Sequence, residues 1–269
     1  MKHPSKFKAL VVSGFILTFL CLSCASYQSV NFKSASIAEG SLVLKGYLYK
    51  PEGNGPFPAV VVLHGCAGID DHFKAWAEQL KKWGYVALMV DSFGPRGVGR
   101  VCGKSFRVSA LERAADAYGA AIYLKQLSYV DSENIGLLGF SHGGWTGMRA
   151  VQKNFMYSVN METMPFKAAV LFYPSCNSRQ HQDIAIPTLI LIGSKDDWTP
   201  SSKCVELDKW VAHPEMLELV VYEGAYHDFD RQKKGYRTYL GHVLKYDNDA
   251  TKDAKEKTKI FFDRHLLSQ

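Results

Sequence analysis

A serine with the spacing of a catalytic nucleophile lies near the middle of the chain. Ser141 occupies the centre of a G-x-S-x-G pattern that begins at Gly139 and ends at Gly143. The apolar residues before it are typical of a strand, and residues 144–151 are compatible with a helix. A tight turn between them would expose the hydroxyl, and glycines allow the backbone to pass closely there. The bare pattern arises by chance in roughly one chain in ten of this length, so it is weak evidence on its own. The strand and helix expected on either side strengthen this interpretation.

A serine nucleophile needs a histidine as general base and a carboxylate that orients the imidazole. With an elbow of this type, the acid and then the histidine follow in loops after later strands. The apolar run at residues 187–192 is followed by Asp196 and Asp197, and the run at 217–222 is followed by His227. We predict His227 as the base and Asp196 as its orienting acid. Asp197 is the less favoured alternative.

These motifs together resemble those of the dienelactone hydrolase family of α/β-hydrolases. The matching segments are HGCAG at 64–68, DSFGPRG at 91–97, the serine elbow at 139–143, GSKDDWTP at 193–200 and GAYHDF at 224–229. The resemblance covers about residues 40–267. It implies an α/β-hydrolase fold, with a mainly parallel central sheet, helices on both faces and no large lid domain.

The chain departs from the best-known family members at the nucleophile. Those members carry a cysteine where this chain has Ser141, and a glutamate in the loop after the strand at residues 59–63. Here that loop begins His64, Gly65 and Cys66. The departure points to an ordinary serine esterase mechanism.

The reaction also requires two backbone N–H groups that hold the oxyanion. We expect one from His142, which follows the nucleophile, and the other from Cys66, with Gly65 as the alternative. For the side chains of His142 and His64 we favour structural roles.

The resemblance also implies basic side chains that hold a substrate carboxylate. Arg231 occupies the position of one such arginine, and Arg96 is a second candidate. The alternative for both is a solvated arginine, and for Arg96 this alternative is favoured. Trp198 is expected to form a wall of an open pocket that suits small esters or lactones. We expect no cofactor and no metal, because Cys and His do not recur at zinc-ligand spacing.

The amino terminus has the charge layout of a secretory signal, since three lysines precede a short apolar stretch at residues 9–22. We predict a signal peptide at residues 1–24, a linker at 25–39 and one hydrolase domain at 40–269. A lipoprotein signal would make Cys24 the lipidated residue and tether the protein to a membrane; ordinary cleavage after Ala25 is the alternative. Removal of three lysines lowers the formal charge from +6 to +3, which gives no reason to expect a nucleic-acid partner.

Strands and helices alternate along the rest of the chain, which favours a parallel sheet covered on both faces. We expect strands at residues 41–50, 59–63, 85–90, 135–139, 168–172, 187–192 and 217–222, and helices at 71–82, 111–127 and 254–267.

Four cysteines remain in the expected exported chain, and they allow three pairings. In the sheet order that the resemblance implies, the loops after the third and fourth strands are neighbours, as are those after the sixth and seventh. The resemblance therefore implies disulfides between Cys66 and Cys102 and between Cys176 and Cys204.

The sequence thus predicts an exported serine hydrolase, periplasmic or anchored as a lipoprotein, that cleaves small carboxylic esters or lactones through an acyl-enzyme. A peptidase or amidase with the same triad is one alternative. A non-catalytic lipoprotein that binds ligands with the same fold is the other.

Overall fold

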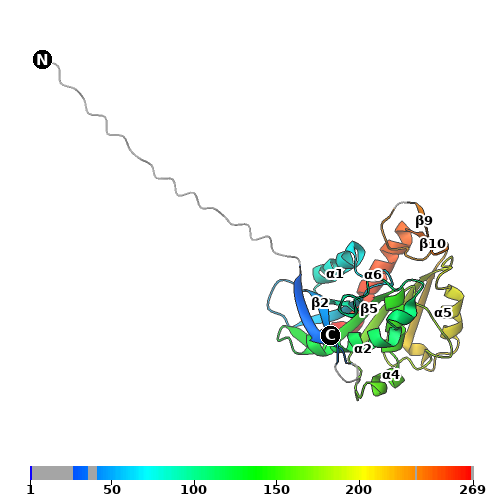
Figure 1. Ribbon diagram of the computed structural model, residues 1–269, viewed down its shortest axis with the longest axis horizontal. Helices are drawn as coiled ribbons and strands as arrows, with labels where there is room; N and C mark the ends of the chain where they lie inside the picture. Colours follow the sequence, from blue (N-terminus) through cyan, green and yellow to red (C-terminus); the bar gives the residue numbers. More distant parts are fainter. Residues whose placement is uncertain (2–26, 36–40, 234, 268–269) are drawn as a thin grey trace.

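The computed structural model describes Met1 and residues 27–35, 41–233 and 235–267 (Figure 1). A central sheet of eight strands is covered by helices on both faces. Apart from Met1, the expected signal peptide at residues 1–24, including the lipidation candidate Cys24, lies outside the described residues.

The strand order identifies the topology of the central sheet. Its strands are β1 (Gln28–Lys33), β2 (Val43–Tyr49), β3 (Phe57–Leu63), β4 (Val86–Asp91), β5 (Val130–Phe140), β6 (Ala168–Phe172), β7 (Thr188–Gly193) and β8 (Leu217–Tyr222). Across the sheet they follow the order β1-β2-β4-β3-β5-β6-β7-β8. Strand β2 is antiparallel to β1 and β4, and the pairs from β4 to β8 are parallel. The expected mainly parallel α/β-hydrolase sheet is confirmed.

The described residues form α-helices at α1 (Asp71–Lys82), α2 (Ala110–Lys125), α3 (His142–Ala150), α4 (Lys153–Ser158), α5 (Ser201–Asp208) and α6 (Asn248–Leu266). Short 3-10 helices lie at Gly94–Arg96, Ser105–Arg107 and Pro214–Met216. Side chains cap three α-helices: Asp70 caps α1, Ser109 and Glu112 form a capping box on α2, and Asp247 caps α6. Within the described part of the chain, every helix is too short or too polar to cross a bilayer.

Different helices cover the two faces of the sheet, because side chains along a strand point alternately to each face. On β5, a Cβ at Gly136 would contact Phe262 of α6, and Phe140 packs against Trp76 of α1. Gly139 lies an odd number of residues from both Gly136 and Phe140, so it points to the opposite face of the sheet, toward α3. Helices α1 and α6 therefore share one face, and α3 lies on the other with α2 packed against it (Figure 1).

The middle strands are buried on both faces. Residues 59–63 of β3 and 86–90 of β4 are fully inaccessible to solvent, as expected for parallel strands between two helical layers. These strands end at one edge of the sheet, so the loops after β3, β5, β7 and β8 come together there.

The sheet begins earlier in the chain than we expected. Residues 28–33, which fall in the expected linker at 25–39, form the edge strand β1 and pair in register with β2 from Gln28 opposite Leu48 to Lys33 opposite Val43. The alternation of buried Val30 and Phe32 with exposed neighbours is the pattern of a half-buried strand.

A two-stranded hairpin after β8 lies outside the central sheet. It consists of β9 (Tyr236–Tyr239) and β10 (His242–Lys245), which pair antiparallel around Leu240 and Gly241. Both turn residues have positive φ, at 51° and 86°, as a two-residue hairpin turn of the I′ type requires. An isolated bridge joins Leu244 to His227, so the hairpin packs beside the expected catalytic histidine.

Candidate active site

Ser141 lies in the turn between β5 and α3, with a backbone conformation of φ 52° and ψ −113°. Its N–H donates to the carbonyl oxygen of Phe172 at 3.0 Å. The turn is too tight for side chains at its glycines. A Cβ at Gly139 would lie 2.4 Å from the carbonyl oxygen of Gly143, and one at Gly143 would lie 2.2 Å from that of Leu63. Close packing of strand, turn and helix therefore fixes this strained serine.

His227 bridges the serine and a buried carboxylate. Its Nε2 lies 2.9 Å from Oγ of Ser141, and its Nδ1 lies 2.7 Å from Oδ2 of Asp196. Since Asp196 only accepts, Nδ1 carries the proton and Nε2 is free to accept one from the serine. This is the arrangement that a serine nucleophile and a general base require.

The carboxylate of Asp196 is held by its own loop. Its Oδ1 accepts from the N–H groups of Trp198 and Thr199 at 3.0 and 2.8 Å, and its Oδ2 accepts from Oγ1 of Thr199 at 2.9 Å. The neighbouring Asp197 points elsewhere, because it accepts from the N–H of Val243 on the hairpin. Between the two acids that we considered, Asp196 is the one beside the imidazole.

The surroundings of His227 favour its protonated form. Burial of the ring opposes the charge, but the carboxylates of Asp196, Asp228 and Asp230 outweigh this effect and raise the pKa of His227 above its ordinary value of 6.5. The imidazole is thus prepared to accept a proton.

Two backbone N–H groups beside Ser141 are available to a ligand. Within the described structure, the N–H groups of Cys66 and His142 donate to no protein acceptor. Cys66 follows β3 and His142 begins α3, and both residues line a cavity that contains Ser141. Gly65, our alternative donor, lines the neighbouring cavity at the serine.

A buried arginine that we did not anticipate supports these two segments. Arg113 of α2 donates to Nδ1 of His142 and to the carbonyl oxygen of His64, both at 2.7 Å. Burial lowers its pKa to about 9. Burial and the nearby guanidinium lower the pKa of His142 to about 3, and burial likewise lowers that of His64. Both imidazoles are neutral in this environment, which agrees with structural roles for them.

Both expected disulfides are present in the structure. Cys66 is bonded to Cys102, and Cys176 is bonded to Cys204. The first bond ties the loop after β3 to the segment after β4, and it forms part of the wall of both cavities at Ser141. Two disulfides indicate an oxidising environment.

Two cavities flank the serine, with volumes of about 350 and 310 Å³. Trp198 lines both of them. Its ring lies 5.2 Å from that of His227 and stacks at 4.8 Å on His242 of the hairpin. Trp198 thus lies between the two cavities and the hairpin, in contact with His227 on one side and His242 on the other.

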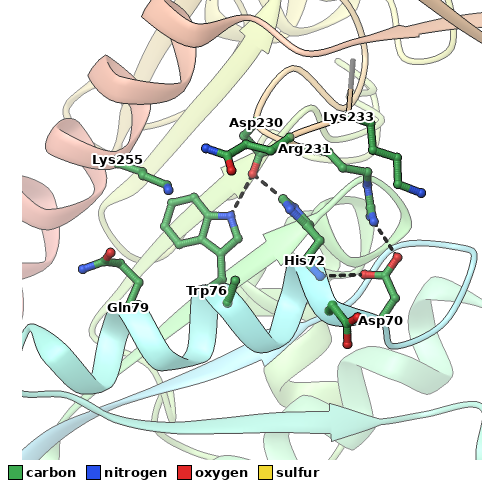
Figure 2. Close-up of a pocket in the computed structure, with 11 residues that line it drawn as sticks. Asp70, His72, Trp76, Gln79, Asp230, Arg231, Lys233 and Lys255 are labelled. Carbon is green, nitrogen blue, oxygen red and sulfur yellow. Dashed lines mark hydrogen bonds and ion pairs between the residues drawn. The ribbon is translucent and has the colours of Figure 1, made fainter. Parts of the chain in front are cut away.

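The two arginines that we singled out differ in their positions. Arg231 lines the larger cavity and forms ion pairs with Asp70 and Asp228. Figure 2 shows the pair with Asp70. Arg96 lies elsewhere: it forms a two-pronged ion pair with buried Asp116 and lines neither cavity at Ser141 among the described residues. It is also not the solvated arginine that we favoured, since its side chain is only 16% exposed.

Two other arginines reach the larger cavity and were missed from the sequence. Arg100 donates to the hydroxyl of Tyr239 at 3.2 Å, and Arg237 lies on β9. The Nε of Arg237 is buried without a hydrogen-bond partner. With Lys233, they give this cavity a cationic rim. The described residues include no cluster of three or more His, Cys, Asp or Glu that could hold a metal ion.

The strand order, together with a serine on a strand-to-helix turn beside an oriented histidine, defines an α/β-hydrolase. The chain belongs to the dienelactone hydrolase family, whose profile matches residues 44–266. It is a hydrolase that acts on ester bonds.

The chain is similar in sequence to one relative and in fold to two solved structures. The chain is 28% identical over 243 residues to a Bradyrhizobium protein named probable 2-oxo-3-(5-oxofuran-2-ylidene)propanoate lactonase, with 83% of this chain and 90% of that protein covered. A dienelactone hydrolase-like promiscuous phosphotriesterase from metagenomic libraries has the same fold, with a TM-score of 0.71 at 18% identity over 90% of this chain and all of that one. Dipeptidyl peptidase 4 of Porphyromonas gingivalis also shares the fold, with a TM-score of 0.65 at 18% identity over 89% of this chain and 35% of that one.

Proposed function

We propose that this protein is an exported serine hydrolase that cleaves small carboxylic esters or lactones. The observation that carries the proposal is the contact chain from Ser141 through His227 to Asp196, at 2.9 and 2.7 Å. In this mechanism Oγ of Ser141 attacks the substrate carbonyl while Nε2 of His227 takes its proton. Asp196 holds the tautomer and stabilises the imidazolium that forms.

The negative charge on the carbonyl oxygen is held by the N–H groups of Cys66 and His142. Their freedom from protein acceptors supports this role, and donors of this kind contribute a large share of catalysis in acyl transfer. His227 then returns the proton to the leaving alcohol, and an acyl-enzyme remains on Ser141. A water molecule then attacks the ester carbonyl of the acyl-enzyme while His227 takes one of its protons. His227 gives that proton to Oγ of Ser141 as the bond to the acyl group breaks, which releases the acid and the free serine.

The cavity suggests substrates of modest size that carry a negative charge. Its volume of about 350 Å³ fits a small molecule. Its rim carries Arg100, Arg231, Lys233 and Arg237 against the two acids Asp70 and Asp228. The Bradyrhizobium relative is named for a lactone that is also a carboxylate, and we propose a carboxylated lactone or ester of this class.

The proposed location is outside the cytoplasm. The two disulfides support this, as does the amino-terminal pattern of lysines followed by apolar residues. Lipidation of Cys24 would tether the enzyme to the membrane surface, and cleavage after Ala25 would release it.

A peptidase or amidase with the same triad is the second candidate, since dipeptidyl peptidase 4 shares the fold. An amide is harder to cleave than an ester, because its nitrogen is a poorer leaving group and must be protonated before it departs. Parallel assays with an ester and the matching anilide therefore distinguish an esterase from an amidase. The other alternative from the sequence, a non-catalytic binding module, does not agree with the assignment of the chain as an ester hydrolase.

The test is hydrolysis of p-nitrophenyl acetate by the mature protein and by Ser141→Ala. We expect turnover by the first and loss of at least about a thousandfold in the second, because triad members act as a unit. The Ser109→Ala variant removes a serine from the cap of α2 instead and should retain activity. Equal rates for Ser141→Ala and the mature protein would refute the proposal.

A further inference from the structure

A second buried carboxylate lies three residues after the catalytic histidine. The side chain of Asp230 is fully inaccessible to solvent. Its Oδ1 accepts from the hydroxyl of Tyr173 at 2.7 Å, and its Oδ2 accepts from Nε1 of Trp76 at 2.8 Å. Nε2 of His72 lies 3.2 Å from Oδ2 (Figure 2). Burial of a carboxylate destabilises the folded state unless such partners compensate it. The surroundings of Asp230 therefore stabilise a buried negative charge.

The partners keep this carboxylate ionised. Burial alone would raise its pKa, but the nearby His72 and the hydrogen bonds from Tyr173 and Trp76 lower the pKa of Asp230 to about 2. Asp230 therefore carries a negative charge at any pH where the enzyme is expected to act.

Tyr173 connects this charge to the catalytic histidine. Its ring centroid lies 4.6 Å from that of His227, and its carbonyl oxygen lies 3.0 Å from Oγ1 of Thr199. The same hydroxyl of Thr199 lies 2.9 Å from Oδ2 of Asp196 and 3.2 Å from Nδ1 of His227. Tyr173 thus contacts the His227 and Asp196 pair through both its ring and its backbone.

The backbone of Tyr173 is in an unfavourable conformation, with φ at 39°. Such a conformation is unfavourable for any residue other than glycine and persists only where neighbours enforce it. The hydrogen bond from its hydroxyl to Asp230 is one such constraint, because it fixes the far end of the buried side chain.

We propose that Asp230 is a positioning residue that acts through Tyr173 to hold the imidazole of His227 at the hydroxyl of Ser141. The proposal rests on the proposed serine hydrolase function. It assigns no contact with substrate to Asp230. Asp230 reaches the base through Tyr173, whereas Asp196 contacts it directly.

The chain contains a matched pair for comparison. The hydroxyl of buried Tyr85 donates to Oδ1 of Asp263 at 2.7 Å. Tyr85 directly precedes β4, so this pair lies at the amino ends of the parallel strands, at the opposite edge from Ser141. It has the same hydrogen bond from tyrosine to aspartate as the pair of Tyr173 and Asp230, although Asp263 is more exposed and also pairs with Lys259. It has no catalytic neighbour.

The experiment compares Tyr173→Phe and Asp230→Asn with Tyr85→Phe and Asp263→Asn. Each is assayed for kcat, KM and the pH dependence of kcat/KM on p-nitrophenyl acetate, and for urea unfolding. We expect Tyr173→Phe to lower kcat by roughly tenfold to a hundredfold with little change in KM, as displacement of a catalytic group does. The control pair should retain kcat even where stability falls.

The pH profile separates positioning from charge. Among the described residues, the carboxylates of Asp196, Asp228 and Asp230 act on the pKa of His227. Arg231 lines the same cavity, and Tyr173 packs on the imidazole ring. Asp230→Asn removes one negative charge and should move the acid limb of kcat/KM to lower pH. Tyr173→Phe keeps that charge, so its acid limb should stay in place while kcat falls.

Unchanged kcat in Tyr173→Phe, or losses equal to those of the control pair, would overturn the proposal. If Asp230→Asn does not fold, the comparison of kcat between Tyr173→Phe and Tyr85→Phe is sufficient to test the proposal. Failure of the proposed function is distinguishable, because the unsubstituted enzyme would then lack turnover and a fluorophosphonate probe would not label Ser141.

Discussion

The carboxylate of Asp196 lies 2.7 Å from Nδ1 of His227 and shares its loop with two backbone donors that fix its orientation. This contact holds the imidazole with its other nitrogen toward Ser141. It also favours the imidazolium, and so it sets the pH range in which the histidine can act as a base.

Activity should therefore depend on pH through His227. The base must be neutral to take a proton, and its pKa is raised above 6.5 because the neighbouring carboxylates outweigh burial. We expect kcat/KM to rise with pH and to reach half of its maximum above pH 6.5, measured with a neutral ester whose own ionisation does not change. A half-point at or below that pH would show that the carboxylates do not raise the pKa of the base.

The glycines of the elbow should be intolerant of a methyl group. In Gly143→Ala the new Cβ would lie 2.2 Å from the carbonyl oxygen of Leu63. We expect a loss of about 2–3 kcal/mol or more in the free energy of unfolding, because backbone must shift to relieve the overlap. Urea denaturation measures it. Gly99→Ala is the control, since a Cβ there meets open space; equal stability of the two variants would contradict this account.

Removal of each disulfide should have a different effect on activity. The Cys66 to Cys102 bond closes a loop of 36 residues and the Cys176 to Cys204 bond one of 28. Each double Cys→Ser variant should lose roughly 3–4 kcal/mol of stability. Only the first bond constrains the segment that supplies the Cys66 N–H, so its loss should lower kcat more. Comparison of kcat at a temperature where both variants are folded checks this, and equal values would count against Cys66 as an oxyanion donor.

The cationic rim should discriminate between charged and neutral substrates. Arg237→Met and Arg100→Met should each raise KM about tenfold for a carboxylated ester, since charge-assisted hydrogen bonds contribute on the order of 1.5 kcal/mol. KM for a neutral ester of the same size should change little. Arg264→Met makes the same change in net charge on α6, where the arginine pairs with Glu218, and it should leave both KM values unchanged. Parallel changes for the two substrates would exclude a role in carboxylate binding.

The sequence allowed prediction of the parallel strands and of the contact chain from Ser141 to Asp196. These depend on local patterns: buried strands are short apolar runs, and the chemistry follows each strand at its end. The hairpin of β9 and β10 was missed because its turn is Leu240-Gly241, whereas Asn or Asp before the glycine is the usual signal. A run of aromatic and β-branched residues on either side of that glycine could have indicated it.

The supporting residues could not be predicted for a different reason. Arg113 and Asp230 act through contacts with residues 29 and 57 positions away in the chain, His142 and Tyr173. From sequence, a charged residue is expected at the surface, and only the folded structure shows that these two are buried and paired. Arg96 illustrates the same limit, since its partner Asp116 follows 20 positions later on α2.

The central claim is that Ser141 carries the acyl group during turnover. The most direct measurement is rapid acid quench of the mature enzyme during hydrolysis of p-nitrophenyl acetate, followed by peptide mapping by mass spectrometry. We expect an acetyl group on the peptide that contains Ser141 and none on the corresponding peptide of Ser141→Ala. Turnover with no acetyl group on that peptide, or acetylation that persists in Ser141→Ala, would contradict this claim.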